Sequence, residues 1–228
     1  LYSGEDLVRM KELVKGANDN HVDFTFALSP GNDICYSSDD DFKATTDKFD
    51  QLRSLGVRSF YIALDDIELK FHCDADRQKY PNKGDGKWIA DAQADYLNRL
   101  ETEYVRKNGL PPLQTVPTNY NGSWEDPYKV ELGTRLDKDI RVQWTGEGVF
   151  SPSITESSVA RAAQSYRTKH LYIWDNFPVN DGRRSQLFLN PLVNRDPNLY
   201  KHIDGITSNP MIEPYASMPA LANYGDYT

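Results

Sequence analysis

The sequence lacks several features that would assign it to a class at once. No apolar run approaches the roughly 20 residues needed to span a bilayer, so no membrane-spanning helix is expected. No glycine-rich phosphate loop follows any expected strand, which argues against nucleotide binding. Only two cysteines occur, Cys35 and Cys73, and their spacing matches no zinc or redox motif. We interpret them as two buried free thiols in preference to a disulfide, which leaves the cellular compartment open.

The chain also has fewer basic than acidic residues. The chain has 26 Lys and Arg against 34 Asp and Glu, a net charge of −8. An acidic surface repels phosphate backbones, so nucleic acid is not an expected partner and a neutral ligand fits better. Apolar residues make up 39% of the 228 residues, which is typical of a globular protein. The 14 Tyr and 4 Trp are the flat apolar rings that sugar-binding clefts use, although such rings also occur without ligands.

Short apolar strands alternate with longer amphipathic helices along the chain. This rhythm, with about six strand–helix units, is typical of parallel α/β folds. A capping box at 153–156 opens one of the helices, and the polar segment 68–87 reads as a loop. The expected strands are 22–28, 59–64, 113–117, 140–144, 171–174 and 203–207, and the expected helices are 3–6 onward, 42–55, 90–107, 128–136, 153–166 and 213–224.

Polar side chains recur where the expected strands end. They are Asp65-Asp66, Asn119-Tyr120, Thr145, Asp175-Asn176 and Asn209. A (β/α)8 TIM barrel gathers such strand ends around one axis, and its active site lies there. We therefore predict an incomplete barrel that forms one catalytic domain over residues 1–228, with its first two units missing. The chain starts without Met or a signal peptide, and the missing units would precede Leu1.

The pair Asp65 and Asp66 is the strongest candidate for chemistry. Consecutive strand residues point to opposite faces, so both carboxylates can face one cleft only where the strand ends and the chain turns. Their mutual repulsion would raise the pKa of one of them, giving a general acid beside an ionised partner. Sequence neighbours cannot straddle a sugar ring, but they suit substrate-assisted cleavage, in which an N-acetyl group of the substrate is the nucleophile. In the alternative without a catalytic role, the pair supplies the N-cap of a helix and an acidic residue of a surface loop.

Six segments in order resemble the signature segments of glycoside hydrolase family 84, which includes O-GlcNAcase and bacterial hyaluronidase-like β-N-acetylglucosaminidases. The bacterial members are the more similar, mainly through FPVND at 177–181. The segments are SPGNDI (29–34), ALDDI (63–67), VPTNY (116–120), QWTG (143–146), WDNFPVND (174–181) and TSNPM (207–211).

The resemblance implies a retaining β-N-acetylglucosaminidase that works through an oxazoline intermediate and removes terminal β-linked GlcNAc from glycoproteins or glycans. Asp65 would orient and polarise the acetamido group, and Asp66 would act as general acid and then general base. Substrate-binding roles are implied for Tyr120, Asn176, Asp181 and Asn209, and for Trp144 and Trp174 as pocket walls. No cofactor or metal is implied, and the cluster around His72 and Asp76 is not interpreted as a metal site.

Each implied role has a structural alternative. Trp174 lies on an apolar strand, where a core position is common. Asn176, Asp181 and Asn209 are residue types that also build turns. Tyr120 could pack beneath its own loop.

Competing functions are a non-catalytic sugar-binding barrel and, less in keeping with the missing phosphate loop, an enzyme on a doubly wound sheet. An open barrel exposes unpaired strand edges, so we expect this segment alone to be unstable or inactive. The resemblance to bacterial members favours a secreted or cell-surface enzyme, with a GlcNAc-containing glycan or glycoprotein as its partner.

Overall fold

The computed structural model describes residues 1–30 and 32–227, without the side chain of Tyr227. Gly31, which belongs to the segment 29–34, and Thr228 therefore lie outside the described residues. The chain forms two compact units. The first comprises residues 1–118 and 134–140, and the second comprises residues 119–133 and 141–228.

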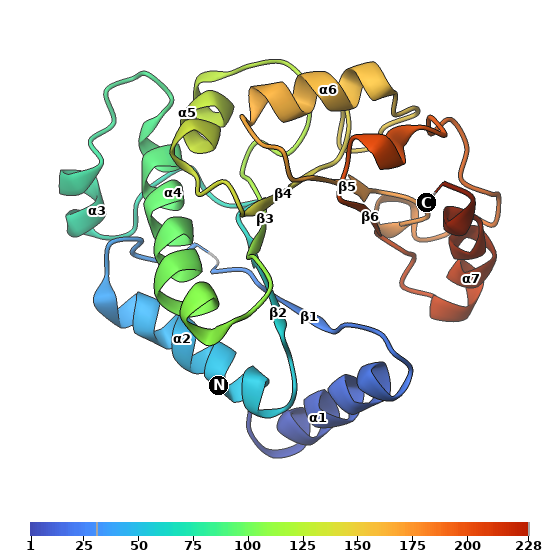
Figure 1. Cartoon of the computed structure of the whole chain (residues 1–228), viewed down its shortest axis with the longest axis horizontal. Coiled ribbons are helices and arrows are strands. Elements are labelled where there is room, and N and C mark those ends of the chain that lie inside the picture. Colours follow the sequence, from blue (N-terminus) through green and yellow to red (C-terminus); the bar gives the residue numbers. More distant parts are fainter. Residues whose placement is uncertain (31, 228) are drawn as a thin grey trace. The chain divides into compact units, whose positions relative to one another are not determined.

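In the first unit, three parallel strands follow one another in chain order (Figure 1). Strand β2 is central, and its residues Ser59 to Ile62 are buried, which agrees with its continuous apolar run. The elements are α1 (Gly4–Asp19), β1 (Thr25–Leu28), α2 (Asp39–Ser54), β2 (Ser59–Ala63), α3 (Asp74–Lys79), α4 (Trp88–Leu100), a π-helical turn (Glu101–Val105), a 3-10 turn (Arg106–Asn108) and β3 (Gln114–Val116).

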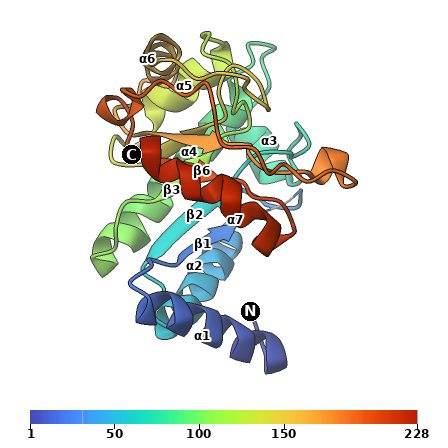
Figure 2. The ribbon, with the colours of Figure 1, turned by 90° about the vertical axis from the view of Figure 1, so that its right-hand side faces the viewer.

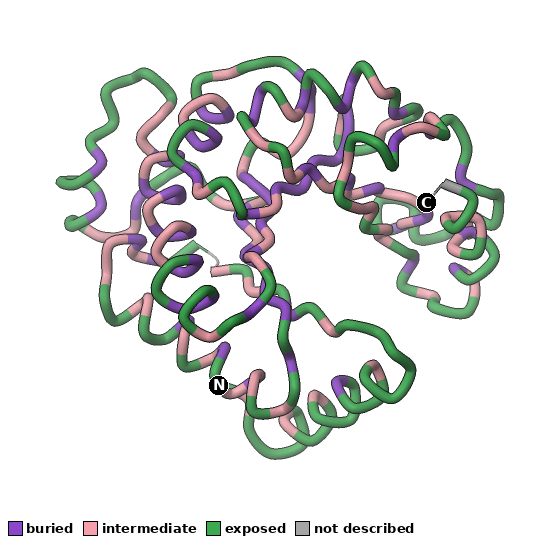
Figure 3. Tube along the Cα trace, viewed as in Figure 1, coloured by how far each residue is buried: buried purple, intermediate pink, exposed green. Residues whose placement is uncertain are grey.

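Aromatic packing joins the helices of the first unit to its sheet. Phe49 of α2 stacks on Phe60 of β2, with ring centroids 4.2 Å apart, and Tyr104 contacts both rings. Figure 3 shows buried residues along β2 and on α4, whereas α1 is mostly exposed. On α1 only Val14 is fully buried, so this helix contributes little to the core.

The second unit repeats the same architecture with β4, β5 and β6, which are parallel and again follow chain order. Helices α5 and α6 lie side by side (Figure 2). A Cβ on Gly133 would lie 1.9 Å from the Tyr166 carbonyl oxygen, so this contact needs glycine. The elements are α5 (Pro127–Arg135), β4 (Arg141–Trp144), α6 (Glu156–Ser165), β5 (Leu171–Asp175), 3-10 turns (Asp181–Arg183 and Leu199–Lys201), β6 (Gly205–Ser208), α7 (Pro214–Ala222) and a final 3-10 turn (Asn223–Tyr227).

The structure confirms the predicted α/β class and all six strands, with shifted ends. Three local predictions need correction. The segment 68–87 is not a simple loop, because α3 forms within it. The helix expected over 90–107 leaves α-helical geometry after Leu100. The capping box involves Thr155 and Ser158 rather than residues 153 and 156. None of the helices in the described residues is long and apolar enough to cross a membrane.

Candidate functional site

The aspartate pair follows β2 at a sharp change of backbone direction. The Leu64 amide still donates to the carbonyl of Val116, which extends the pairing with β3 by one residue. Asp66 then takes a positive φ of 50°, a left-handed conformation that ends the extended chain. This turn ends the strand, so the alternation of side chains between opposite faces does not continue through the aspartate pair. Asp65 is half-buried, whereas Asp66 is exposed.

The electrostatic setting of the pair is uneven. Burial raises the pKa of the Asp65 carboxyl above its usual range, and the charge of Asp66 raises it further. Burial also raises the pKa of the nearby Tyr61 phenol, and the Asp65 charge adds to that shift. From the sequence we expected repulsion to raise the pKa of the general acid, which the resemblance places at Asp66. In the structure the raised pKa belongs instead to Asp65, and burial rather than repulsion is its main cause.

A covalent clip holds the segments that follow β1 and β2. Cys35 and Cys73 form a disulfide with Cα atoms 5.6 Å apart, so the prediction of free thiols was wrong. The two cysteines are 38 residues apart in sequence, and the pairing of β1 with β2 brings the segments that carry them together. The same two segments are also joined by Asn32, whose Oδ1 accepts from the Glu68 amide at 2.6 Å.

Asp76 reinforces this clip from inside the protein. Its carboxylate is fully buried and accepts hydrogen bonds from the Tyr36 amide at 2.7 Å and from the Ser37 amide at 2.9 Å. The Ser37 hydroxyl donates to it as well, at 2.6 Å. Asp76 lies close to both cysteine sulfurs, but a disulfide offers no thiolate to a metal. We therefore read the Asp76 group as structural.

In the second unit, three of the sequence-predicted site residues form one hydrogen-bonded cluster. The side-chain oxygen of Asn176 accepts from the indole of Trp174 at 2.9 Å and from the amide of Asn209 at 3.0 Å. The Asn176 amide donates to the Val149 carbonyl at 2.7 Å. This amide cluster, Trp174, Asn176 and Asn209, joins the ends of β5 and β6 to the segment after β4. The alternative of isolated turn residues does not describe these contacts.

A buried ion pair supports the amide cluster, and sequence reasoning missed it. Arg195 forms a bidentate pair with Asp175, with N–O distances of 2.6 and 2.7 Å. Asp175 is 2% exposed and Arg195 is 8% exposed. Arg195 also donates to the carbonyls of Pro152 and Val193. Asp175 was noted only as the neighbour of Asn176, and nothing in the spacing points to an arginine 20 residues later.

The loop that carries Tyr120 is fixed by a buried lysine. Lys129 is 1% exposed and donates to the carbonyls of Asn121 and Gly122 at 2.6 and 2.9 Å. Burial lowers the pKa of its ammonium group. The Tyr120 carbonyl accepts from the Thr145 amide at 2.9 Å, which joins this loop to the end of β4. Tyr120 itself is half-buried, so its loop is held in place while part of the residue stays accessible.

Trp144 and Asp181 differ in how directly they can contact a ligand. Trp144 is fully buried, and its indole donates to the Gly122 carbonyl at 3.0 Å. It can therefore only support a pocket wall from behind. Asp181 is exposed, and its carboxylate accepts from the Gly182 amide at 2.8 Å. Among the described residues its other oxygen has no partner, so that oxygen is able to accept from a ligand.

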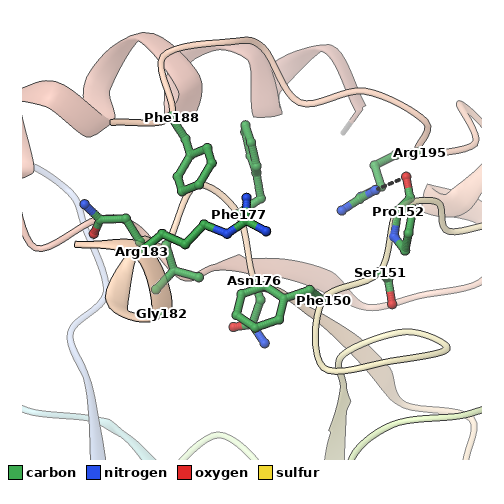
Figure 4. Close-up of a pocket in the computed structure, with 11 residues that line it drawn as sticks. Phe150, Ser151, Pro152, Asn176, Phe177, Gly182, Arg183, Phe188 and Arg195 are labelled. Atoms are coloured by element: carbon green, nitrogen blue, oxygen red, sulfur yellow. Dashed lines mark hydrogen bonds between the residues drawn. The ribbon is translucent and has the colours of Figure 1, made fainter. Parts of the chain in front are cut away.

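A cavity of about 480 Å³ opens beside the amide cluster, entirely within the second unit (Figure 4). Its walls are mostly apolar, and Asn176 belongs both to these walls and to the amide cluster. The cavity is lined by Phe150, Ser151, Pro152, Asn176, Phe177, Val179, Asn180, Gly182, Arg183, Phe188 and Arg195.

Comparison with known proteins identifies relatives of the whole segment. A family profile described as beta-N-acetylglucosaminidase matches residues 1–228. Protein O-GlcNAcase of Rattus norvegicus is 29% identical over 97% of this chain, and the same protein of Mus musculus matches equally. The chain spans 24% of the length of these curated relatives.

Two solved structures share the fold. A mutant O-GlcNAc hydrolase from Thermobaculum terrenum superposes with a TM-score of 0.91 and 35% identity, covering 99% of this chain and 48% of that one. CpGH84B gives a TM-score of 0.86 and 37% identity, covering 99% of this chain and 39% of that one. The fold is thus α/β with six parallel strands, an incomplete (β/α)8 barrel as predicted. Since the family profile covers every residue, the chain belongs to the β-N-acetylglucosaminidases of glycoside hydrolase family 84.

Proposed function

We propose that the complete protein is a retaining exo-β-N-acetylglucosaminidase that removes terminal β-linked GlcNAc from glycoproteins or glycans by substrate-assisted catalysis. The observation that carries this proposal is the pair Asp65 and Asp66 at the turn after β2, half-buried and exposed respectively. Membership of the family supports the substrate, and the names of the relatives support O-linked GlcNAc as one form of it.

In the proposed first step, Asp65 accepts a hydrogen bond from the acetamido N–H of the substrate. The acetamido oxygen attacks the anomeric carbon, and the bond from that carbon to the leaving oxygen breaks. Asp66 gives its proton to the leaving oxygen, so an oxazoline forms on the sugar. In the second step Asp66 takes a proton from water, and the water oxygen opens the oxazoline with net retention.

The raised pKa of Asp65 suits its proposed role. As the acetamido oxygen attacks, positive charge develops on the amide nitrogen and its N–H becomes more acidic. A carboxylate with a raised pKa is the stronger hydrogen-bond acceptor for that N–H. Asp66 is the more exposed of the two, which suits a group that exchanges protons with the leaving group and with water.

We assign the binding of the sugar hydroxyls to residues of the second unit. Asn176 uses its side-chain oxygen and one N–H within the amide cluster, and Asn209 uses one N–H there. Each keeps a second amide N–H that can donate to a sugar hydroxyl. Asp181 would accept from the outer hydroxyls, and Tyr120 would lie near the acetamido group. Trp174 would form part of the wall, and buried Trp144 would support it.

The decisive test is Asp66→Asn in the complete protein. Loss of general acid catalysis should lower kcat/KM about 10²- to 10⁴-fold for substrates with poor leaving groups, and much less for activated aryl glycosides. Asp23→Asn, which removes the same charge from an exposed position before β1, is the matched control and should keep wild-type rates. A uniform loss with both leaving groups would contradict the assignment. GlcNAc binding without turnover by the wild-type protein would favour a sugar-binding module.

We further propose that the enzyme is secreted or displayed at the cell surface. The disulfide between Cys35 and Cys73 supports this, because such bonds persist mainly in oxidising compartments. Fractionation of the native host with an antibody to the protein is the direct test, and recovery in the cytosol alone would contradict the proposal.

A further inference from the structure

The cavity beside the amide cluster has a composition that the proposed reaction does not explain. Three phenylalanines, Phe150, Phe177 and Phe188, line it together with Val179 and Pro152. Figure 4 shows the rings of Phe177 and Phe188 on one side and the ring of Phe150 on the other. These side chains offer apolar surface and no hydrogen-bonding group.

Arg183, a cation with no side-chain partner among the described residues, lies between these apolar side chains. Figure 4 shows Arg183 extending across the cavity between the phenylalanine rings. Its side chain is exposed, and its guanidinium has no ion pair or hydrogen bond to another residue in the described part of the chain. The other arginine in the lining, Arg195, is already paired with Asp175. In a chain with a net charge of −8, Arg183 therefore offers an uncompensated positive charge next to apolar walls.

The cavity is tied to the residues that the proposed function assigns to the sugar. Asn176 lines it, and the amide of Asn176 also holds the Val149 carbonyl, directly before Phe150. Gly182 and Arg183 follow Asp181 in the same 3-10 turn. A group in the cavity would thus lie beside the bound sugar within this unit.

We propose that this cavity is a peptide subsite, which takes an apolar side chain of the glycosylated protein and pairs Arg183 with an acidic residue next to it. The inference rests on the proposed function and gives it a sequence preference. Burying an apolar side chain against the three rings removes apolar area from water, which is favourable. A carboxylate is the natural partner of a free guanidinium, which it can meet with two parallel hydrogen bonds.

A second sugar is the less suitable occupant. Its ring would bring several hydroxyls into the cavity, and the phenylalanine walls could not replace the hydrogen bonds that those hydroxyls make with water. The polar groups in the lining are few, and Asn180 already donates to the Gln186 carbonyl and to Glu213. A polysaccharide substrate therefore becomes the alternative outcome of the test.

The experiment uses the complete protein and synthetic peptides that carry O-linked GlcNAc on serine. One set places a Phe-Glu pair two or three residues before or after the glycosylated serine, and the matched set has Ser-Gln there. We expect kcat/KM to be roughly five- to tenfold higher for at least one Phe-Glu position. Arg183→Gln should remove the preference for Glu, and Phe150→Ser should remove the preference for Phe. Both positions are exposed, so neither substitution disturbs the core.

Arg184→Gln is the matched control, because Arg184 is the neighbouring exposed arginine and does not line the cavity. It should keep both preferences, and all variants should cleave an aryl N-acetylglucosaminide at the wild-type rate. Equal rates for the two peptide sets, or a Phe150-dependent preference for a disaccharide over the peptides, would overturn the subsite. Calorimetry with the same peptides separates the two proposals: a Phe-Glu preference in Kd without any turnover would remove the proposed function and retain the subsite.

Discussion

Asp65 and Asp175 occupy similar places in the two units, yet their surroundings differ. Both lie where a parallel strand ends, β2 and β5 respectively. Asp175 is almost completely buried and shares both oxygens with Arg195. Asp65 is half-buried, its carboxylate has no ion pair among the described residues, and the like charge of Asp66 raises its pKa. The counter-ion Arg195 gives the Asp175 carboxylate a structural role. The Asp65 carboxylate has no such counter-ion among the described residues and is therefore available for catalysis.

The two carboxylates also differ in the contacts that stabilise the segments around them. Around Asp65, the disulfide and the buried Asp76 hold the neighbouring segments, and this support does not use the Asp65 carboxylate. Around Asp175, the ion pair is itself the support, and the amide cluster is built beside it. If this comparison is right, removing Asp175 should damage the fold, and removing Asp65 should damage only the reaction.

The largest expected effect on stability is therefore that of Asp175→Asn. The substitution leaves the Arg195 guanidinium buried without its counter-ion, so we expect a loss of about 3–5 kcal/mol in the free energy of unfolding. Denaturant unfolding of the purified protein measures this loss. Replacing both partners, as in Asp175→Leu with Arg195→Leu, should recover much of it. A loss below about 1 kcal/mol for the single variant, the range of an exposed pair, would contradict a structural role for this ion pair.

The disulfide should come next in size. Replacing Cys35 and Cys73 by Ser releases a loop of 38 residues in the unfolded chain, and we expect the free energy of unfolding to fall by about 2–4 kcal/mol. Amide hydrogen exchange should show the lost protection concentrated after β1 and β2, including Glu68, rather than in the second unit. Equal loss of protection around Asn209 would mean that the clip stabilises the whole chain and not the surroundings of the aspartate pair.

The strand ends were predictable because elementary patterns determine them. An apolar run such as 59–64 that polar residues stop abruptly is typical of a buried strand, and parallel strands bring their ends to the same edge. The pair Asp65-Asp66 therefore stood out, and the position of Asn176 after β5 did so for the same reason. These inferences needed only local sequence and the periodicity of a strand.

The supporting contacts could not be predicted, because they depend on which segments the fold places together. Cys35 meets Cys73, and Asp175 meets Arg195, only after the strands are in place. No local pattern marks Lys129 as buried, since lysine is usually exposed, and its partners are backbone carbonyls that the sequence does not distinguish. Nothing in the sequence distinguishes Arg183, which lines the cavity and has no side-chain partner among the described residues, from the other exposed arginines.

Asp65→Asn sharpens the comparison through its pH dependence. The pKa of Asp65 is raised in the folded protein, so the unfolded chain releases this proton at lower pH. Its contribution to stability is thus complete below the ordinary pKa of about 3.9 and is lost as pH rises through the folded-state value. Relative to wild type, Asp65→Asn should become more stable from pH 3 to pH 7. Chemical denaturation across this range measures the difference, and a trend of opposite sign would mean that a counter-ion lowers the pKa.

The smallest expected effect concerns the pair itself. Burial is the main cause of the raised Asp65 pKa, and the Asp66 charge is the lesser one. In Asp66→Asn the pKa of Asp65 should therefore fall slightly but stay above its usual range, as carboxyl NMR titration can follow. A return to the ordinary value would mean that repulsion, not burial, dominates, and the two acids would then titrate as one coupled system. An unchanged value would mean that the two charges do not influence each other. The proposed division of labour would then lose its electrostatic basis, because each acid would have to be tuned by its own surroundings alone.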